Sequence, residues 1–165
     1  MWTLKLILES EKASIFSPRE STCEISEFEK FLSIKPSLTD SQLLQDFDSI
    51  ISALNKMLKD CGARENLFRL EGGRIKAIPL FTSIGRKKGV GTLRLYCIRY
   101  SKRLLIVGNG GIKKVKKYEE DSALKSIVDT LRQIDSKVFS KARKKKISFD
   151  NYKEFKNLLE TIIIK

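Results

Sequence analysis

The residues best suited to chemistry are the cations and tyrosines of one stretch, LRLYCIRYSKRLLIVGNGGIKKVKKY, which runs from Leu93 to Tyr118. It holds eight Lys or Arg residues and no Asp or Glu. Cleavage of RNA by its own 2′-hydroxyl needs a base, an acid and positive charge on the developing phosphorane. The chain has no histidine, so the base and the acid would be Tyr, Lys, Asp or Glu. The guanidinium of arginine is permanently charged and holds its N–H donors in a fork, so it is suited to bind the phosphate oxygens.

The stretch predicts a β-hairpin, and strand alternation sorts its side chains between two faces. We expect the leucines and Cys97 to face the core, and Arg94, Tyr96 and Tyr100 to face outward as a wall that meets a polar ligand. Neighbouring cations should make a Tyr or Lys proton on this wall easier to lose. A second interpretation stays open, in which these are ordinary amphipathic side chains with solvated polar ends. Strand alternation also assigns the charged residue Arg99 to the core face, and the sequence gives no reason for its presence there.

Glycines follow the second strand of the hairpin, and GNGG at Gly108 to Gly111 predicts a turn whose backbone N–H groups approach phosphate oxygens. It is not a Walker motif, because no Gly-Lys pair followed by Ser or Thr is present. The candidate catalytic residues are Arg94 for the phosphate, Lys113 and Lys114 for negative charge, and Tyr96 or Tyr118 for proton transfer. The candidate nucleic-acid-binding residues are Arg86, Lys87, Lys88, Lys102, Arg103, Lys116 and Lys117.

The formal net charge of +13 is concentrated in one segment. The 47 residues from Gly72 to Tyr118 contain 13 basic residues and no acidic residue. Such a field attracts polyanions and speeds their association without specifying a reaction. A nucleic acid, an acidic protein and a membrane surface all remain candidate partners. The basic run from Lys141 to Lys146 suits the negative end of a helix dipole and receives no catalytic role.

The sequence patterns predict that helices and strands of an α+β fold position these residues. We expect an antiparallel sheet packed against two N-terminal helices, with additional C-terminal helices. The chain opens with a strand pattern, and the polar segment 9–24 predicts a loop. Capping boxes that begin at Ser26 and Thr39 predict the starts of the two helices. Strands interrupted by glycine are expected over residues 67–111, with an exposed loop from Ile84 to Gly91.

Two apolar stripes predict further helices, one after Glu119 and one from about Asp150. A chain of 165 residues can bury one sizeable core, so we expect a single domain over residues 1–165, with a C-terminal helical extension from about residue 147. Cys23, Cys61 and Cys97 are odd in number and lack metal-ligand spacing, which indicates reduced thiols, and we expect neither a metal nor a cofactor.

The N-terminal segment lacks the basic leader and cleavage site of a signal peptide. No apolar run approaches the roughly 20 residues that a membrane span needs. These features predict a cytoplasmic protein that does not enter the membrane.

The order of a leading strand, two helices and an antiparallel sheet with an arginine-bearing hairpin resembles the RelE/ParE superfamily of toxin proteins, including its HigB-like members. LRLYCIRY matches the arginine-bearing central strand, RLLIVGNGG its partner, and GIKKVKKY the basic edge before the last helix. The resemblance spans roughly residues 1–142. It implies a small basic toxin neutralised by an acidic antitoxin. In the RelE and HigB branches it also implies a metal-independent ribonuclease that cuts mRNA on the ribosome.

Under this resemblance Arg94 matches the strand arginine, and Lys113, Lys114 and Tyr118 match the basic edge. The chain departs from the family in its greater length, an extra strand at residues 74–81 and a helix after Lys146.

Two other functions remain open. A non-catalytic binder of nucleic acid or of a topoisomerase, as in the ParE branch, would use the same cations without needing tyrosine hydroxyls. A structural or phage-associated protein would use the basic loop only to dock on an acidic partner. The tyrosines discriminate between these alternatives and catalysis, because a passive binder tolerates Phe at Tyr96 and Tyr118 whereas a proton-transfer site does not.

Overall fold

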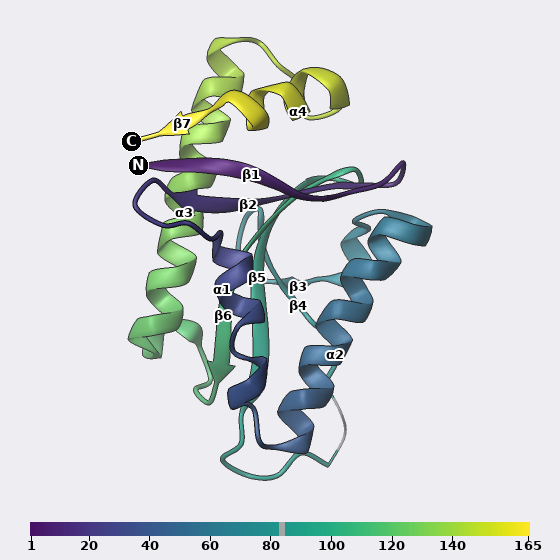
Figure 1. The fold of residues 1–165 in the computed structure, drawn as a ribbon, viewed down its shortest axis with the longest axis vertical. Helices are drawn as coiled ribbons and strands as arrows, with labels where there is room; N and C mark the ends of the chain where they lie inside the picture. Colours follow the sequence, from purple (N-terminus) through teal and green to yellow (C-terminus); the bar gives the residue numbers. More distant parts are fainter. Residues whose placement is uncertain (83–84) are drawn as a thin grey trace.

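The structure, a computed structural model, describes residues 1–82 and 85–165. Figure 1 shows the arrangement of its helices and strands. In chain order they are β1 (Trp2–Glu9), β2 (Ser14–Glu20), α1 (Glu27–Leu32), α2 (Ser41–Lys56), β3 (Arg69–Leu70), β4 (Ile75–Ile78), β5 (Thr92–Ser101), β6 (Leu104–Lys113), α3 (Ser122–Lys144), α4 (Tyr152–Thr161) and β7 (Ile163–Ile164). Short 3₁₀ or π turns occupy Lys35–Ser37, Met57–Cys61, Glu65–Leu67 and Tyr118–Glu120.

One seven-stranded sheet forms the centre of the fold, in the order β3-β4-β5-β6-β2-β1-β7. Neighbouring strands are antiparallel except for β2 and β6, which run parallel where Ser14–Phe16 pairs with Leu104–Ile106. The expected antiparallel sheet is therefore wrong at this pair. The expected loop over residues 9–24 is also wrong, because Ile15 and Phe16 of β2 are fully buried between the two helical layers.

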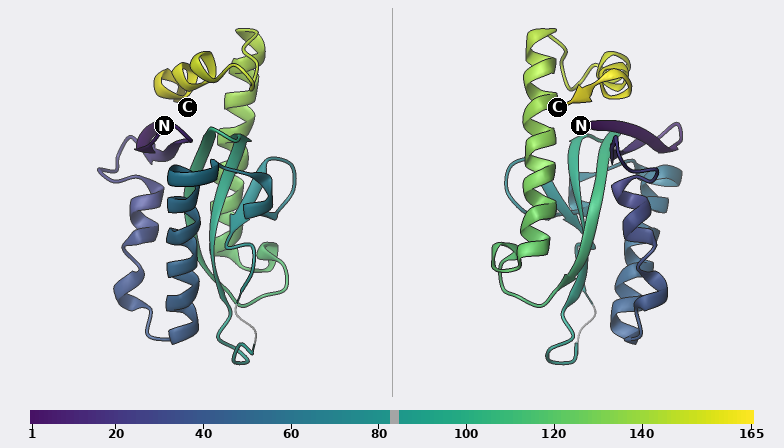
Figure 2. Two further views of the ribbon diagram at one scale, coloured as in Figure 1. Left: turned by 90° about the vertical axis from the view of Figure 1, so that its right-hand side faces the viewer. Right: turned by 60° about the vertical axis from the view of Figure 1, so that its left-hand side comes forward.

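Helices cover both faces of the sheet (Figure 2). α1 and α2 pack against the face that carries Leu93, Leu95 and Cys97. α3 and α4 pack against the face that carries Tyr96 and Ile98. The fold is therefore mixed α/β, and the two N-terminal helices cover only one of the two faces. β5 is buried on both faces, as is typical of a central strand between helical layers, and its buried residues are apolar or aromatic except for Arg94.

Local sequence determines where the helices begin. Ser26 and Glu29 form the capping box predicted for α1. α2 starts one residue later than predicted, because the side chain of Asp40, and not that of Thr39, accepts a backbone N–H of the first turn. Asp121 caps α3 in the same way, because its side chain accepts the backbone N–H groups of Ala123 and Leu124.

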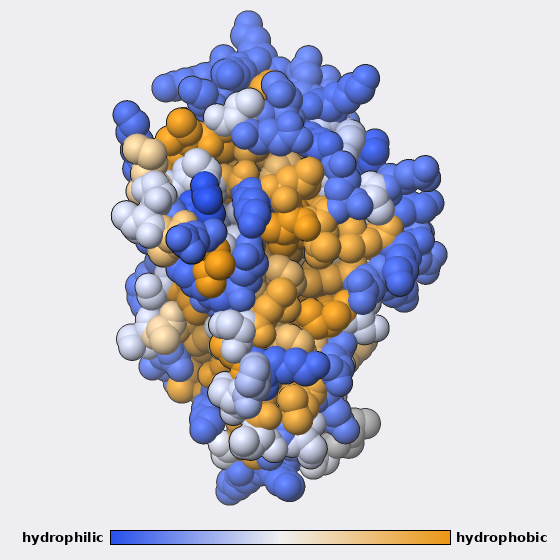
Figure 3. All heavy atoms as spheres, viewed as in Figure 1, coloured by the Kyte–Doolittle hydropathy of each residue, from blue (hydrophilic) through white to orange (hydrophobic). Residues whose placement is uncertain are grey.

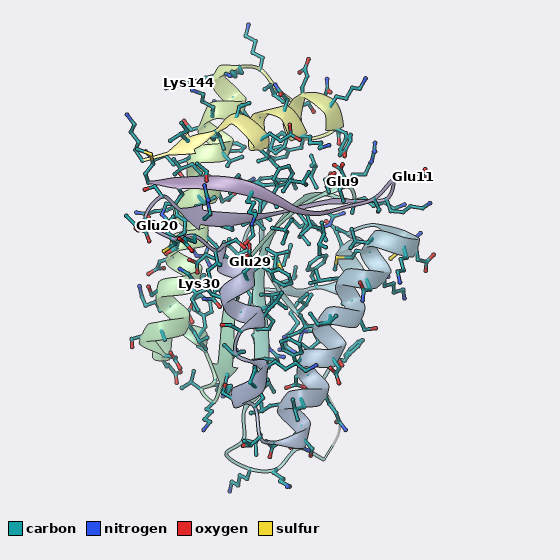
Figure 4. The ribbon with its side chains drawn as sticks, in the orientation of Figure 1. Glu9, Glu11, Glu20, Glu29, Lys30 and Lys144 are labelled. Carbon is teal, nitrogen blue, oxygen red and sulfur yellow. The ribbon has the colours of Figure 1, made fainter. Side chains whose placement is uncertain are left out.

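The C-terminal segment completes the sheet and does not extend away from it. β7 pairs with β1, and apolar residues of α4 join the core under α3. Glu9 of β1 forms an ion pair with Lys156 of α4, and Glu29 of α1 forms one with Lys5 of β1, with Nζ–Oε1 at 2.9 Å (Figure 4). These two ion pairs therefore link β1 to both α4 and α1.

Candidate functional site

β5 carries Arg94 and Tyr96 on the face beneath α3, on the parity that strand alternation predicts. The expectation that this face is an outward wall is wrong, because Arg94 is only 4% exposed and Tyr96 is fully buried. The physical reason lies on β6. A Cβ at Gly108 would lie 3.0 Å from Leu131 of α3, so the glycine lets α3 settle close to the sheet.

Three polar atoms on this buried face lack hydrogen-bond partners among the described residues: Nε and Nη1 of Arg94, and the hydroxyl of Tyr96. Leaving a buried polar group unpaired costs about 1–3 kcal/mol, and more when the group is charged. Burial lowers the pKa of the Arg94 guanidinium to about 10, and repulsion from Arg69 adds to this effect. The guanidinium is thus a buried cation whose donors are available to an anion or an ordered water.

Tyr96 behaves differently from what the cationic sequence predicts. Burial raises the pKa of its hydroxyl far above the ordinary value, and the charge of Glu71 raises it further, while Arg94 opposes the shift. Neighbouring cations do not make this proton easier to lose, because removing the phenolate from water outweighs its attraction to Arg94. Tyr96 therefore remains protonated at neutral pH and can only donate its proton.

Tyr118 closes the same region from the turn before α3. Its ring meets that of Tyr96 edge-on, with 6.2 Å between centroids, and its side chain is 7% exposed. Its hydroxyl accepts a hydrogen bond of 2.9 Å from Nη2 of Arg132, which also donates to the carbonyl oxygen of Glu71 at 3.1 Å. Sequence reasoning missed Arg132, because nothing in the local pattern separates it from the other cations of α3.

The lysine edge adjoins Arg94 along the sheet. Arg94 pairs with Gly111, and Thr92 pairs with Lys113, so Lys113 follows the cross-strand partner of Arg94 by two residues. Alternation from Gly111, which faces α3, puts the Lys113 side chain on the Arg94 side of the sheet and Lys114 on the other. Lys113 is half-buried and Lys114 is exposed. The fold thus brings one lysine of the predicted pair to the Arg94 face.

GNGG belongs to β6 and does not form the predicted phosphate-binding turn. The register shifts opposite Tyr96, because Leu95 pairs with Gly110 whereas Cys97 pairs with Val107. A Cβ at Gly110 would lie 1.9 Å from the carbonyl oxygen of Arg94, so only glycine fits there. The glycines allow close packing, of α3 at one position and of β5 at another.

No family model, curated protein or solved structure matches this chain.

The predicted nucleic-acid-binding cations separate into two groups. Lys87, Lys88, Lys116 and Lys117 are exposed and lie near the end of the hairpin where Thr92 pairs with Lys113. The other group, Lys102 and Arg103, lies at the β5–β6 turn, about 30 Å away along a ten-residue strand. The Arg103 guanidinium stacks over the Tyr152 ring, with Cζ 3.6 Å from the centroid. A compact site can therefore include only the first group.

Arg86 is engaged in a buried ion pair. Its Nη1 and Nη2 atoms contact the two carboxylate oxygens of Asp46 at 2.9 and 2.8 Å, and Asp46 is only 3% exposed. Asp46 also accepts the Leu93 N–H at 2.9 Å, and Arg86 Nε donates to the Gly91 carbonyl at 3.2 Å. This network holds the segment from Gly85 to Leu93 against α2. The predicted loop is described from Gly85 onward, and Ile84 lies outside the described residues.

Arg99 also has a structural role that the sequence did not reveal. Its Nε atom donates to the carbonyl oxygen of Ala63 at 2.5 Å, and its Nη1 lies 3.4 Å from Glu65. Arg99 lies at the end of the apolar face of β5, and its contacts with Ala63 and Glu65 hold the segment after α2 against this strand.

Figure 3 shows hydrophilic side chains gathered towards both ends of the molecule, with apolar surface between α1 and α2. Within residues 1–82 and 85–165, no group of three or more His, Cys, Asp or Glu side chains could hold a metal ion. In the same residues, no helix has both the length and the apolar character to cross a membrane.

Proposed function

We propose that this protein binds and cleaves RNA, with Arg94 as the group that holds the scissile phosphate. The observation that carries the proposal is the buried Arg94 guanidinium with two unpaired nitrogens, on the same face as the unpaired hydroxyl of Tyr96. A buried cation without an anion is costly. A phosphate would supply acceptor oxygens in the forked geometry that a guanidinium prefers.

In the proposed reaction the RNA 2′-hydroxyl attacks the adjacent phosphorus and the bond to the 5′-oxygen breaks, which leaves a 2′,3′-cyclic phosphate and a 5′-hydroxyl. Arg94 and Lys113, the lysine on the Arg94 face, stabilise the negative charge of the phosphorane, and the exposed Lys114 attracts the RNA. Tyr96, which holds its proton, donates to the leaving oxygen. The 2′-hydroxyl proton passes to a solvent base, and Tyr118, whose hydroxyl is held by the hydrogen bond from Arg132, orients the attacking oxygen.

The resemblance to RelE/ParE toxins supports mRNA on the ribosome as the substrate and an acidic antitoxin as the partner. Part of the element order supports this proposal, because two helices precede the antiparallel meander β4–β5–β6 and a helix follows its basic edge, whereas β2, between β1 and α1, is not part of the resemblance. Arg94 is almost completely covered. An RNA phosphate can therefore reach it only when the covering side chains move, and substrate binding supplies the energy for that movement.

The test is an assay on a defined mRNA, both free in EDTA and in a translating extract, with the chemistry of the new ends determined. We expect 2′,3′-cyclic phosphate ends, and a rate at least about a hundredfold lower for Arg94→Gln, as for the loss of a group that stabilises transition-state charge. Lys137→Gln, an exposed change on α3, should leave the rate unchanged. Intact mRNA in both conditions with the natural chain would overturn the proposal.

One observation favours a second function, the binding of a polyanion without cleavage. Lys114, Lys116 and Lys117 are exposed, and no ion pair among the described residues includes them, whereas Arg94 and Tyr96 are buried. Charge reversal at the exposed lysines should weaken RNA binding in steps and lower the salt dependence by about 0.7 per lost phosphate contact on a single strand. Affinity that does not change with salt would exclude this function.

A further inference from the structure

The unpaired groups of Arg94 and Tyr96 share a face of the sheet with the edge strand β3. Arg69 of β3 pairs with Ala77 of β4, and Ala77 pairs with Tyr96 of β5, so these residues form one row across three strands. Side chains that lie opposite one another in such a row point to the same face. Ala77 and Tyr96 are buried beneath α3, and the short side chain of Ala77 leaves space between Arg69 and Tyr96.

Electrostatics also indicate that residues of this edge lie near the unpaired groups. Burial is the largest cause of both pKa shifts at the site. In addition, the positive charge of Arg69 lowers the pKa of Arg94, and the negative charge of Glu71 raises the pKa of Tyr96. Arg69 and Glu71 are themselves only half-buried, so they lie between the site and solvent. We call residues 69–71 the strap.

The strap has few contacts that hold it in place. β3 has two residues and is the outermost strand on its side of the sheet (Figure 1). Leu70 is 77% exposed and therefore adds little to the core. Phe68, which is 4% exposed, anchors the start of the strap, and Gly72 and Gly73, both at positive φ, form the turn at its end. A short edge strand between one anchor and two glycines is a segment that opens locally at low cost.

Two arginine side chains hold the strap closed. Nη2 of Arg132 donates to the carbonyl oxygen of Glu71 at 3.1 Å and to the hydroxyl of Tyr118 at 2.9 Å, so it joins the strap to the turn before α3. At the other end of the strap, Nη1 of Arg69 donates to the carbonyl oxygen of Leu80 at 3.3 Å. Arg132 is exposed, so water can replace its bond to the strap.

The closed arrangement carries a cost that opening removes. Nε and Nη1 of Arg94 and the hydroxyl of Tyr96 have no hydrogen-bond partner within the described part of the chain. When the strap moves away, water or an anion reaches these atoms and supplies the missing bonds. Opening therefore exchanges the bonds of the strap for bonds to the buried groups, which keeps the open state within thermal reach.

We propose that the strap is a mobile cover over Arg94 and Tyr96, held closed by Arg69 and Arg132, and that its opening admits the phosphate of the substrate. The identity of this anion rests on the proposed RNA cleavage, whereas the mobility of the cover does not. A phosphate oxygen can take the place of the Glu71 carbonyl as the acceptor for Arg132. The entering phosphate thus removes one of the two bonds that keep the strap closed.

Acetylation of tyrosine hydroxyls by N-acetylimidazole, without RNA, measures the opening. Tyr96 and Tyr100 are both buried on this face, but the Tyr100 hydroxyl donates to Asp135 at 3.1 Å and its ring packs against Phe149 and Phe155. We expect Tyr96 to react at least about tenfold faster than Tyr100 in the natural chain, because local opening exposes Tyr96 without unfolding the protein. Peptide mass spectrometry distinguishes the two sites.

Two variants release the two ends of the strap separately. Arg69→Met keeps most of the side-chain length and loses the bond to Leu80. It should speed the acetylation of Tyr96 at least about threefold, as expected for the loss of one hydrogen bond, and leave Tyr100 within about twofold. Arg132→Ala, which removes the bond to the strap from α3, should have the same effect on the two tyrosines.

The matched controls each remove one positive charge at an exposed position. Arg64→Met is the control for Arg69→Met, and Lys137→Ala, on α3, is the control for Arg132→Ala. Both controls should leave the two acetylation rates unchanged. Equal rates for the two tyrosines in the natural chain would overturn the proposal, as would variants in which both rates rise together, because general unfolding would then be the route to Tyr96.

An mRNA cleavage assay separates this proposal from the proposed function. Cleavage that depends on Arg94, without selective acetylation of Tyr96, would refute the mobile cover and leave the ribonuclease. Selective acetylation in a chain that leaves mRNA intact would support the cover and refute the ribonuclease. Where both are observed, Arg69→Met should raise kcat/KM for mRNA about threefold, because more of the protein is open. An unchanged value would show that the phosphate does not enter past the strap.

Discussion

Gly110 of β6 lies so close to Arg94 of β5 that a Cβ atom on the glycine would be 1.9 Å from the Arg94 carbonyl oxygen. The contact occurs beside the register shift at which Gly108 and Asn109 lie opposite Tyr96. The position of the candidate site therefore depends on a residue with no side chain on the neighbouring strand.

Replacement of that glycine should be costly. Gly110→Ala should lower the free energy of unfolding by about 1–3 kcal/mol or more, because the methyl group must displace backbone atoms of β5. Gly111→Ala is the matched control, since its Cβ would meet only a flexible side-chain atom of Leu124 at 3.3 Å. Urea unfolding measures both variants. Equal stabilities of the two variants would mean that β5 can yield at this point.

The unpaired guanidinium predicts a conflict between stability and function. Arg94→Met should leave the free energy of unfolding unchanged or raise it by about 1–3 kcal/mol, because a buried cation without an anion is replaced by an apolar side chain of similar length. Phosphate binding and cleavage should be lost in the same variant. Arg64→Met, at an exposed position, controls for the loss of one charge. A loss of more than about 1 kcal/mol in Arg94→Met would instead indicate that the guanidinium has strong partners in the folded protein.

The Asp46–Arg86 pair predicts the opposite behaviour for another arginine. Arg86→Ala should cost about 3–5 kcal/mol, because it leaves the buried carboxylate without its bidentate partner. Lys87→Ala, one residue further on and exposed, should change stability by less than about 0.5 kcal/mol. Thermal and urea unfolding measure both variants. If the two changes proved equivalent, the ion pair would contribute little to holding the segment before β5.

Alkaline pH should destabilise the fold. Burial raises the pKa of the Cys97 thiol and of the Tyr96 and Tyr100 hydroxyls, so the folded protein keeps protons that the unfolded chain releases from about pH 9 upward. The unfolded state then binds fewer protons, and stability falls as pH rises, by up to about 1.4 kcal/mol per pH unit for each group. Folding contributions from these three groups are therefore complete below about pH 9.

Replacing one of these three titrating groups isolates its contribution to the loss of stability at alkaline pH. Above pH 9, Cys97→Ala should reduce the slope of the free energy of unfolding against pH by an amount that corresponds to at most one bound proton. Val107→Ala, at the cross-strand partner of Cys97, should lower stability by a constant amount and leave the slope as it is. Parallel slopes in the two variants would show that the thiol does not titrate on unfolding.

Local patterns were sufficient for several features. The capping box at Ser26 predicts the start of α1, and alternation along β5 assigns Arg94 and Tyr96 to one face and the leucines to the other. Both depend on residues close together in the sequence, whose geometry the backbone repeats fix. β2 was missed because its polar ends and Pro18 do not form a strand pattern, and only its contacts with β1 and β6 make it a strand.

The sequence by itself determined the hairpin, the parity of its side chains and the concentration of 13 basic residues without an acid between Gly72 and Tyr118. Only the tertiary structure decided that neither face of β5 is exposed, because exposure depends on what packs against a strand and not on its own pattern. α3 covers Arg94 and Tyr96, Asp46 from α2 engages Arg86, and the turn residues Lys102 and Arg103 are separated from Lys113 by the length of a strand. Desolvation then reverses the pKa shift expected for Tyr96, since burial acts on the phenolate more strongly than nearby positive charge.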